Sequence, residues 1–321
     1  MALIDVHAHF LPPVYREALA AAGIDRPDGM PRTPDWSADE HVAVMDRLGI
    51  DVAVLSVSSP GVHFGAGLAA SDAEALARQV NDVAAATVVA HPGRFGAFAS
   101  LPLPSIDAAL AEVERALDGL HLDGVNLLTH VDGVYLGDAR LDPLLAELHR
   151  RRTVVFIHPT SPTCWEATSL GYPRPMLEFP FDTTRAVTNL ILSDAMDRFR
   201  DIRWIVPHAG GTLPFLAQRI VGMSALVGHE PADILGQLAR LHYDLAGSAN
   251  ATSLAALLTV AARSQVLYGS DWPFTPEPGV ARGLEWINGA DAVAPHELAA
   301  AAIRLFPQLV ADRARPADEE R

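Results

Sequence analysis

Short runs of apolar residues alternate with longer amphipathic segments along almost the whole chain. The apolar runs are rich in β-branched side chains and predict buried β-strands, while the segments between them repeat their apolar positions with the spacing of an α-helix. The predicted strands span Leu3–His9, Val52–Val57, Phe95–Ser100, Gly124–Leu128, Val154–His158, Arg203–His208, Leu241–Leu245 and Val266–Gly269. The predicted helices span Ala38–Leu48, Ser71–Val89, Ser105–Leu117, Leu141–Arg151, Thr183–Met196, Thr212–Val227 and Asn250–Arg263.

A strand followed by a helix, repeated eight times, predicts an α/β fold of one domain, the (β/α)8 TIM barrel. An open doubly wound sheet is the alternative, but it would place a glycine-rich turn after the first strand, where this chain has His-Ala-His-Phe. We expect residues 1–311 to form the barrel and the charged stretch 312–321 to be a tail. Two long connections, 10–37 and 159–182, follow predicted strands, so we expect them to wall the active-site pocket.

The charge of the chain excludes several classes of protein. Its formal net charge is −15, from 39 acidic and 24 basic residues, so it lacks the basic surface of a nucleic-acid binder and favours a small-molecule partner. All of the basic residues are arginine. A chain without lysine forms no Schiff base, holds no pyridoxal phosphate aldimine, has no Walker-type phosphate loop and cannot bridge two metals with a carbamylated lysine.

Cysteine content and hydropathy bear on the compartment. Cys164 is the only cysteine, which rules out an intrachain disulfide and a cysteine zinc cage. The first residues lack the charged and apolar regions of a signal peptide, and no apolar run approaches the ~20 residues of a membrane helix. We therefore expect a cytoplasmic protein without a membrane partner.

Histidines and one aspartate fall at the ends of predicted strands. His7 and His9 are two residues apart on the first strand, so both imidazoles point to the same face. His158 ends the fifth strand, His208 the sixth, and Asp271 follows the eighth. Taken singly, each could be a structural histidine or a helix cap. Because barrel enzymes keep their active sites at this end of the strands, the five together predict a metal site.

The motifs around these residues resemble those of the amidohydrolase superfamily. They are HAH after strand one, HP after strand five, HAGG after strand six and GSDWP after strand eight. The resemblance is to the branch of decarboxylases around aminocarboxymuconate-semialdehyde decarboxylase and γ-resorcylate decarboxylase. Three longer stretches look most like 6-methylsalicylate decarboxylases: PTPDWSADEHVAVMDRLGI, GVYLGDARLDPLLAELHRRRTVVFIHPT and LEFPFDTTRAVTNLILS.

The resemblance implies a site and a reaction. His7, His9, His158 and Asp271 would ligate one divalent metal, with zinc preferred and manganese the alternative. His208 would not bind the metal, and with Asp271 it would serve acid/base catalysis. No organic cofactor is implied, and relatives of this branch are commonly homodimers or homotetramers.

The predicted substrate is a small aromatic carboxylate. The reaction would be non-oxidative decarboxylation of a 2-hydroxybenzoate-type acid, releasing CO2, with hydrolysis of a lactone or amide as the alternative, because the same residues serve both. Arg32 is a candidate clamp for the carboxylate in the first long connection, which also offers Arg16 and Arg26. Arg185, in the helix after LEFPFDTT, is another candidate, although an exposed helical arginine is the commoner explanation. Phe181 and Phe274 complete the predicted substrate contacts.

Overall fold

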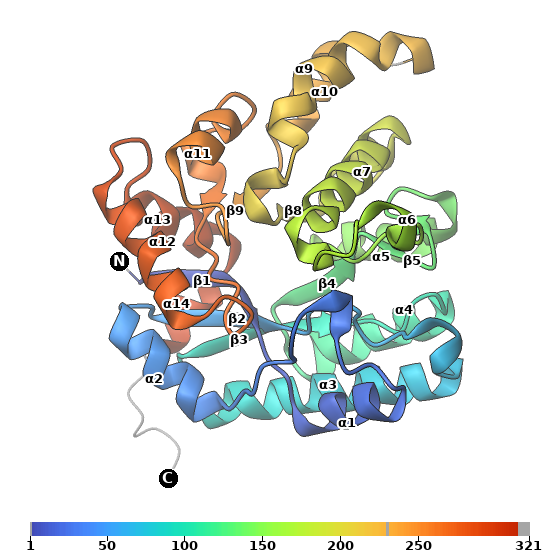
Figure 1. Ribbon diagram of the computed structural model, residues 1–321, viewed down its shortest axis with the longest axis vertical. Helices are drawn as coiled ribbons and strands as arrows, with labels where there is room; N and C mark the ends of the chain where they lie inside the picture. Colours follow the sequence, from blue (N-terminus) through green and yellow to red (C-terminus); the bar gives the residue numbers. More distant parts are fainter. Residues whose placement is uncertain (1, 229–230, 314–321) are drawn as a thin grey trace.

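Eight parallel strands form a ring in the computed structural model, which describes residues 2–228 and 231–313 (Figure 1). Each strand pairs with the next one in the ring, in the order β1-β2-β3-β4-β7-β8-β9-β10. The ring closes between β10 and β1, where the Val6 amide donates to the Tyr268 carbonyl at 3.0 Å and Ala8 forms a bridge with Trp272. The strands are β1 Ile4–His9, β2 Val52–Ser56, β3 Phe95–Ser100, β4 Gly124–Leu128, β7 Val154–His158, β8 Arg203–Val206, β9 His242–Asp244 and β10 Val266–Leu267.

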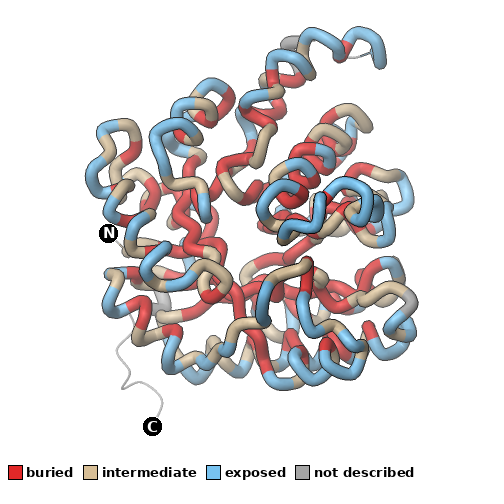
Figure 2. Tube along the Cα trace, in the orientation of Figure 1, coloured by how far each residue is buried: buried red, intermediate tan, exposed pale blue. Residues whose placement is uncertain are grey.

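The predicted barrel is therefore confirmed, and all eight predicted strands are present. The strands are buried along nearly their whole length, which explains why their sequences read as continuous apolar runs (Figure 2). Helices surround the ring and cover its outer face (Figure 1). They are α1 Pro13–Ala21, α2 Ala38–Leu48, α3 Ala70–Ala90, α4 Ile106–Glu114, α5 Asp142–Arg151, α6 Trp165–Thr168, α7 Glu178–Leu192, α8 Ala195–Arg198, α9 Leu213–Ser224, α10 Pro231–Leu238, α11 Ala251–Leu257, α12 Glu277–Gly289, α13 Pro295–Leu305 and α14 Pro307–Arg313.

The long connections contain more regular structure than their sequences predicted. The 10–37 connection begins with helix α1, whose first residue is a proline, a residue that is favoured at the start of a helix. Helix α7 begins at Glu178, five residues before the predicted start, at the end of the 159–182 connection. A small antiparallel hairpin, β5 His130–Val131 and β6 Val134–Tyr135, also follows β4. These elements stiffen the face of the barrel that carries the carboxyl ends of the strands.

A column of aromatic rings links the C-terminal helices to the first strand. The Phe306 ring packs against Phe98 at 5.9 Å between centroids, and Phe98 stacks on Phe156 at 5.5 Å. The Phe156 ring in turn meets the His7 imidazole edge to face at 4.8 Å. All four side chains are essentially buried, so His7 rests on a close-packed apolar support.

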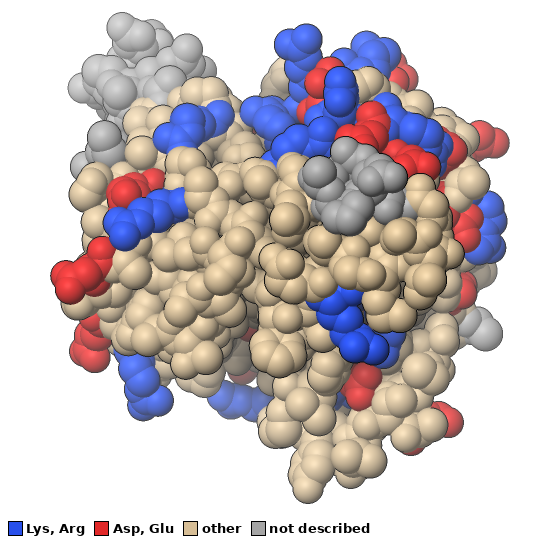
Figure 3. Space-filling model, turned by 90° about the horizontal axis from the view of Figure 1, so that it is seen from above, with Lys and Arg blue, Asp and Glu red and all other residues tan. Residues whose placement is uncertain are grey.

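The last described helix, α14, ends close to the predicted boundary between the barrel and the tail. Helix α14 continues across the predicted barrel boundary at residue 311 as far as Arg313, and the rest of the predicted tail lies outside the described residues. Within the described ranges, none of the helices combines the length and the apolar character needed to cross a membrane. On the face shown in Figure 3, charged side chains of both signs gather at one edge, and a wide area carries few charges.

Candidate active site

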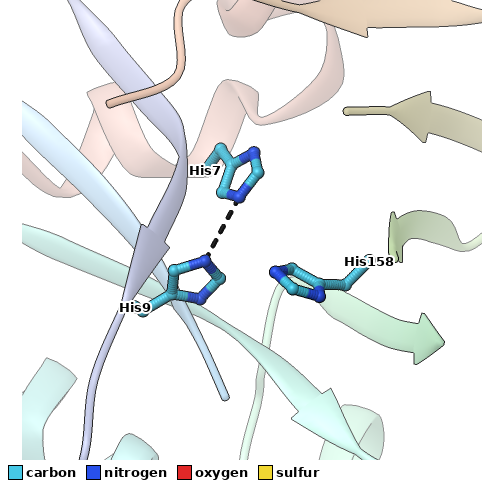
Figure 4. Close-up of side chains that lie close together, drawn as sticks. All are labelled: His7, His9 and His158. Atoms are coloured by element: carbon cyan, nitrogen blue, oxygen red, sulfur yellow. Dashed lines mark hydrogen bonds between the residues drawn. The ribbon is translucent and has the colours of Figure 1, made fainter. Parts of the chain in front are cut away.

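Three imidazoles converge at the carboxyl end of the barrel strands. His7 and His9 come from β1 and His158 from β7, on the far side of the ring, and all three are buried. Figure 4 shows the three rings pointing toward one common space. The Nε2 atoms of His7 and His9 are 3.2 Å apart, and one nitrogen from each of the three rings lies within 4.8 Å of the others. This is a buried metal site of three histidines.

The tautomer of each of these imidazoles is set by its neighbours. In every case Nδ1 lies beside an oxygen that can only accept a hydrogen bond, so Nδ1 carries the proton and Nε2 keeps a lone pair. The acceptors are Asp244 Oδ2 at 2.9 Å from His7, the Ser56 carbonyl at 3.2 Å from His9 and the Pro159 carbonyl at 2.7 Å from His158. The protein thus presents three unprotonated nitrogens to the same space.

This donor set fits a divalent metal ion. Two Nε2 lone pairs that face each other at 3.2 Å repel unless a positive charge lies between them. A tetrahedral zinc ion with Zn–N bonds of about 2.0–2.1 Å would hold neighbouring nitrogens about 3.3 Å apart, close to the observed separation. Burial also lowers the pKa of His9 and lowers that of His158 well below its usual range, which keeps both rings neutral and able to bind a cation.

Asp271 lies at the edge of the three-histidine site. It follows β10 in a left-handed conformation (φ 59°), and its backbone amide donates to the His7 carbonyl at 2.8 Å. Its Oδ1 is 3.1 Å from His9 Nε2 and 3.6 Å from His7 Nε2. Burial alone would raise the pKa of Asp271, but its contacts with the His9 and His7 imidazoles outweigh burial and lower it overall. The carboxylate is therefore ionised and faces the space shared by the imidazoles.

His208 stands beside the three histidines in a short 3₁₀ turn, His208–Gly210, after β8. Its ring centroid is 5.0 Å from that of His7, and its Nδ1 is buried without a hydrogen-bond partner among the described residues. Burial is the main cause that lowers the pKa of His208 to about 4. The glycines that follow have a steric role, because a Cβ on Gly211 would lie 2.4 Å from the Pro180 carbonyl oxygen.

Asp244 is a functional residue that the sequence analysis missed. It ends β9, is fully buried, and accepts the Nδ1 proton of His7 through Oδ2. Its other oxygen accepts the backbone amides of His208 at 3.0 Å and Ala246 at 2.9 Å. One carboxylate thus orients both a metal-site histidine and the turn that carries His208. The signal was present in the sequence: an aspartate at the end of the seventh strand, in LHYDL.

A cavity of about 360 Å³ opens above the site and is large enough for a single-ring ligand. His158, His208 and Asp271 contribute to its base, and both long connections contribute to its walls, as predicted. The remaining walls combine large apolar side chains with polar ones, and the large apolar side chains are Met30, Met176, Phe179 and Phe274. The site therefore combines a chamber with aromatic and methionine walls and ionisable groups at one end.

The predicted substrate contacts differ in their positions. Phe274 lines the cavity and packs edge to face on His9, with 5.4 Å between the ring centroids. Arg32 and Phe181 are exposed and do not line this cavity. Arg185 does not line it either; its side chain is 48% exposed and pairs with Asp182 at 3.3 Å, one helical turn earlier. A role in substrate binding stays a prediction for all four residues, and Phe274 has the most favourable position.

Comparisons with known proteins give a consistent result. The amidohydrolase family model matches residues 4–307. The 6-methylsalicylic acid decarboxylase acuB of Aspergillus aculeatus is 38% identical, covering 95% of this chain and 96% of the relative. The 6-methylsalicylic acid decarboxylase of Penicillium expansum is 36% identical, covering 98% and 100%. A crystal structure described as an amidohydrolase superposes with a TM-score of 0.89 at 30% identity, covering 96% of this chain and 100% of that one.

Proposed function

The chain belongs to the amidohydrolase family, as its motifs indicated, and we propose that it is a non-oxidative decarboxylase of a 6-methylsalicylate-type aromatic acid. The observation that carries this function is the identity of 36–38% with two 6-methylsalicylic acid decarboxylases over nearly the whole length of both chains. The geometry agrees with it, because a chamber of single-ring size with aromatic walls ends at ionisable groups. The products are the corresponding phenol and CO2, and the reaction needs neither oxygen nor an organic cofactor.

We further propose that His7, His9, His158 and Asp271 hold one divalent ion. The three unprotonated Nε2 atoms and the ionised Asp271 carboxylate form the nitrogen-rich donor set with one oxygen that suits zinc, with manganese as the alternative. When bound, such an ion supplies positive charge that attracts the carboxylate and the ortho oxygen of the substrate and stabilises negative charge on the ring during the reaction.

Proton movement is assigned to Asp271 and His208. Asp271 is ionised in the free protein, so it is ready to accept the proton of the substrate's ortho hydroxyl. That proton is then donated to the ring carbon bearing the carboxylate, which breaks aromaticity; the bond to the carboxylate cleaves, its electron pair restores the aromatic ring, and CO2 leaves. His208, neutral because its pKa is about 4, lines the same cavity and is placed to exchange a proton with Asp271 or the substrate.

The cavity walls orient the ring and exclude water. Phe179 and Phe274 present aromatic surfaces at the end of the cavity near His158 and His9, respectively, because each contacts that imidazole edge to face. Met30 and Met176 come from the two long connections and offer adaptable apolar contacts. A ring with a methyl substituent is suited to such walls, since its uncharged face gains from leaving water.

Solvent isotope incorporation tests the reaction class. In D2O the phenol produced should carry one deuterium at the carbon that lost its carboxylate, because the proton donated to that carbon comes from exchangeable groups. Salicylates and simple lactones should be assayed side by side, with CO2 release and acid release followed separately. Lactone or amide turnover without CO2 from any hydroxybenzoate would reject the decarboxylase and favour the hydrolase that the same residues could support.

We also propose a homodimer or homotetramer in the cytoplasm. Large apolar side chains are exposed on neighbouring helices, including Phe181 of α7 and Phe215 of α9, which is 85% exposed. Surfaces of this kind are typical of subunit interfaces. Light scattering at micromolar concentration tests the assembly, and a monomer would contradict it. The lone exposed Cys164 is compatible with a reducing compartment.

A further inference from the structure

A second polar cavity lies at the opposite end of the barrel from the histidine site. It has a volume of about 260 Å³ and lies where β8 and β9 begin, since Arg203 is the first residue of β8 and His242 the first of β9. We call it the arginine cavity. Its lining residues are Arg200, Arg203, Arg240, His242, Asp201, Met196, Ile202 and Trp204. Active sites of barrel enzymes lie at the other face, so catalysis does not account for this cluster.

Two of the three arginines have no acidic partner within residues 2–228 and 231–313. Arg203 is partly buried, and its guanidinium donates to two carbonyl oxygens, from Nε to Arg152 at 3.0 Å and from Nη1 to Leu305 at 3.4 Å. Neither Arg203 nor Arg200 forms an ion pair with a carboxylate among the described residues. Burial lowers the pKa of Arg203, as expected for a charge that is partly removed from water and compensated by carbonyl oxygens alone. This is unexpected in a chain with a formal net charge of −15.

The other charged groups of the arginine cavity offset only part of these two charges. Arg240 is already paired with Asp197 at 2.6 Å. Asp201 lines the cavity, and its carboxylate is 3.8 Å from His149. His242 also lies near positive charges. Burial is the largest cause of its lowered pKa, and the charges of Arg304 and Arg203 lower this pKa further. The cavity therefore has a local excess of positive charge.

We propose that the arginine cavity binds the phosphate group of a small phosphomonoester. Two unpaired guanidinium groups match the two negative charges of a phosphate better than the single charge of a carboxylate, and guanidinium groups bind phosphate oxygens through paired N–H donors. The cavity is larger than a phosphate ion needs, and its apolar wall of Met196, Ile202 and Trp204 leaves space for a small organic group. This inference does not depend on the reaction catalysed at the histidine site.

Calorimetric titration of the purified protein tests the inference with three probes: phenyl phosphate, inorganic phosphate and benzoate. Phenyl phosphate should bind with the highest affinity, inorganic phosphate more weakly, and benzoate at least about 10-fold more weakly than phenyl phosphate. The variants Arg200→Gln and Arg203→Gln should each weaken phenyl phosphate binding about 10-fold, the scale of one hydrogen bond to a charged group. Arg282→Gln is the matched control, because Arg282 is an exposed arginine on α12 without an ion-pair partner among the described residues. This variant should bind phenyl phosphate with the affinity of the wild-type protein.

Binding at the histidine site is the competing explanation, and His208→Asn separates the two. Phenyl phosphate binding that survives in both cavity variants but is lost in His208→Asn would overturn the proposal, as would no binding of phenyl phosphate at millimolar concentration. Equal affinity for benzoate would refute the preference for phosphate, and equal affinity for inorganic phosphate would refute the monoester. A crystal soaked with phenyl phosphate should show its phosphorus between Arg200 and Arg203.

Discussion

Replacing Asp244 with asparagine should weaken metal binding, although Asp244 is not itself one of the proposed metal ligands. The reason lies in the two oxygens of Asp244, which both accept hydrogen bonds. Oδ1 accepts hydrogen bonds from the backbone amides of His208 and Ala246, and Oδ2 accepts one from Nδ1 of His7. An amide has only one oxygen, and in Asp244→Asn it would have to serve one side or the other.

Both orientations of the new amide are costly. If the asparagine oxygen keeps its hydrogen bonds from the two backbone amides, the NH2 group faces His7. Nδ1 of His7 must then accept a hydrogen bond, so its proton moves to Nε2, the atom that would bind the metal. If its oxygen faces His7 instead, two buried backbone N–H groups lose their acceptor and meet an NH2 group. Loss of such a supporting carboxylate reduces metal affinity about 10- to 100-fold, equivalent to about 1.4–2.7 kcal/mol.

Competition with a chelator measures this effect directly. Wild-type protein and Asp244→Asn should be titrated with a chromophoric chelator, and the metal retained should be determined by elemental analysis. Asp182→Asn is the matched control, because Asp182 is also fully buried and accepts from Thr129 and Tyr135, but lies outside the metal site. If Asp244→Asn holds its metal within about threefold of wild type while remaining folded, the assigned tautomer of His7 is wrong.

Three further predictions follow from the same site and from one buried histidine. Replacing His158 or Asp271 with alanine should remove most of the single divalent ion found in wild type by elemental analysis, and two ions per chain or undiminished metal in both variants would reject the ligand set. His208→Asn should keep the metal but lose about 100-fold in turnover; loss of the metal would make His208 a ligand. Burial lowers the pKa of His41 to about 3, so between pH 3 and about 6.5 the unfolded chain binds a proton there that the folded one excludes. Because of this group, the free energy of unfolding should therefore fall by about 1.4 kcal/mol for each pH unit below pH 6.5. His41→Gln keeps an acceptor for Trp36, so the free energy of unfolding measured with urea should depend less on pH in this variant. An unchanged dependence on pH would contradict the assignment.

The barrel and its three histidines were predictable from the sequence because both depend on local pattern. Buried parallel strands read as continuous apolar runs, and the eight of them were found from those runs alone. The spacing of His7 and His9 fixed their common direction, and the end of a strand fixed the position of His158. Helix α1 was missed because the prolines and glycines of its surroundings indicated a loop, although its own proline at the first position is a helix-start signal.

The position of Asp244 at the end of a strand was a signal in the sequence, but its pairing with His7 was not predictable because it joins distant parts of the chain. Asp244 and His7 are 237 residues apart, and only closure of the barrel brings them together. Arg185 shows the opposite problem: in sequence it suits a substrate clamp, but Asp182 lies three residues earlier on the same helix and accepts its guanidinium. This second pair is local, and its spacing of three residues on one helix is visible in the sequence, whereas the pairing of Asp244 with His7 requires the closed barrel.

The hydrogen bonds at Nδ1 distinguish the metal-site histidines from His208. Three imidazoles have Nδ1 bound to an oxygen acceptor, which locks the proton there and leaves Nε2 available at all times. His208 has a buried Nδ1 without a partner among the described residues, so its surroundings do not select one tautomer. A metal ligand benefits from a fixed lone pair, whereas a group that exchanges protons with a substrate must change its protonation during each cycle. This difference, independent of the family comparison, supports His7, His9 and His158 as ligands and His208 as the proton-exchanging imidazole beside them.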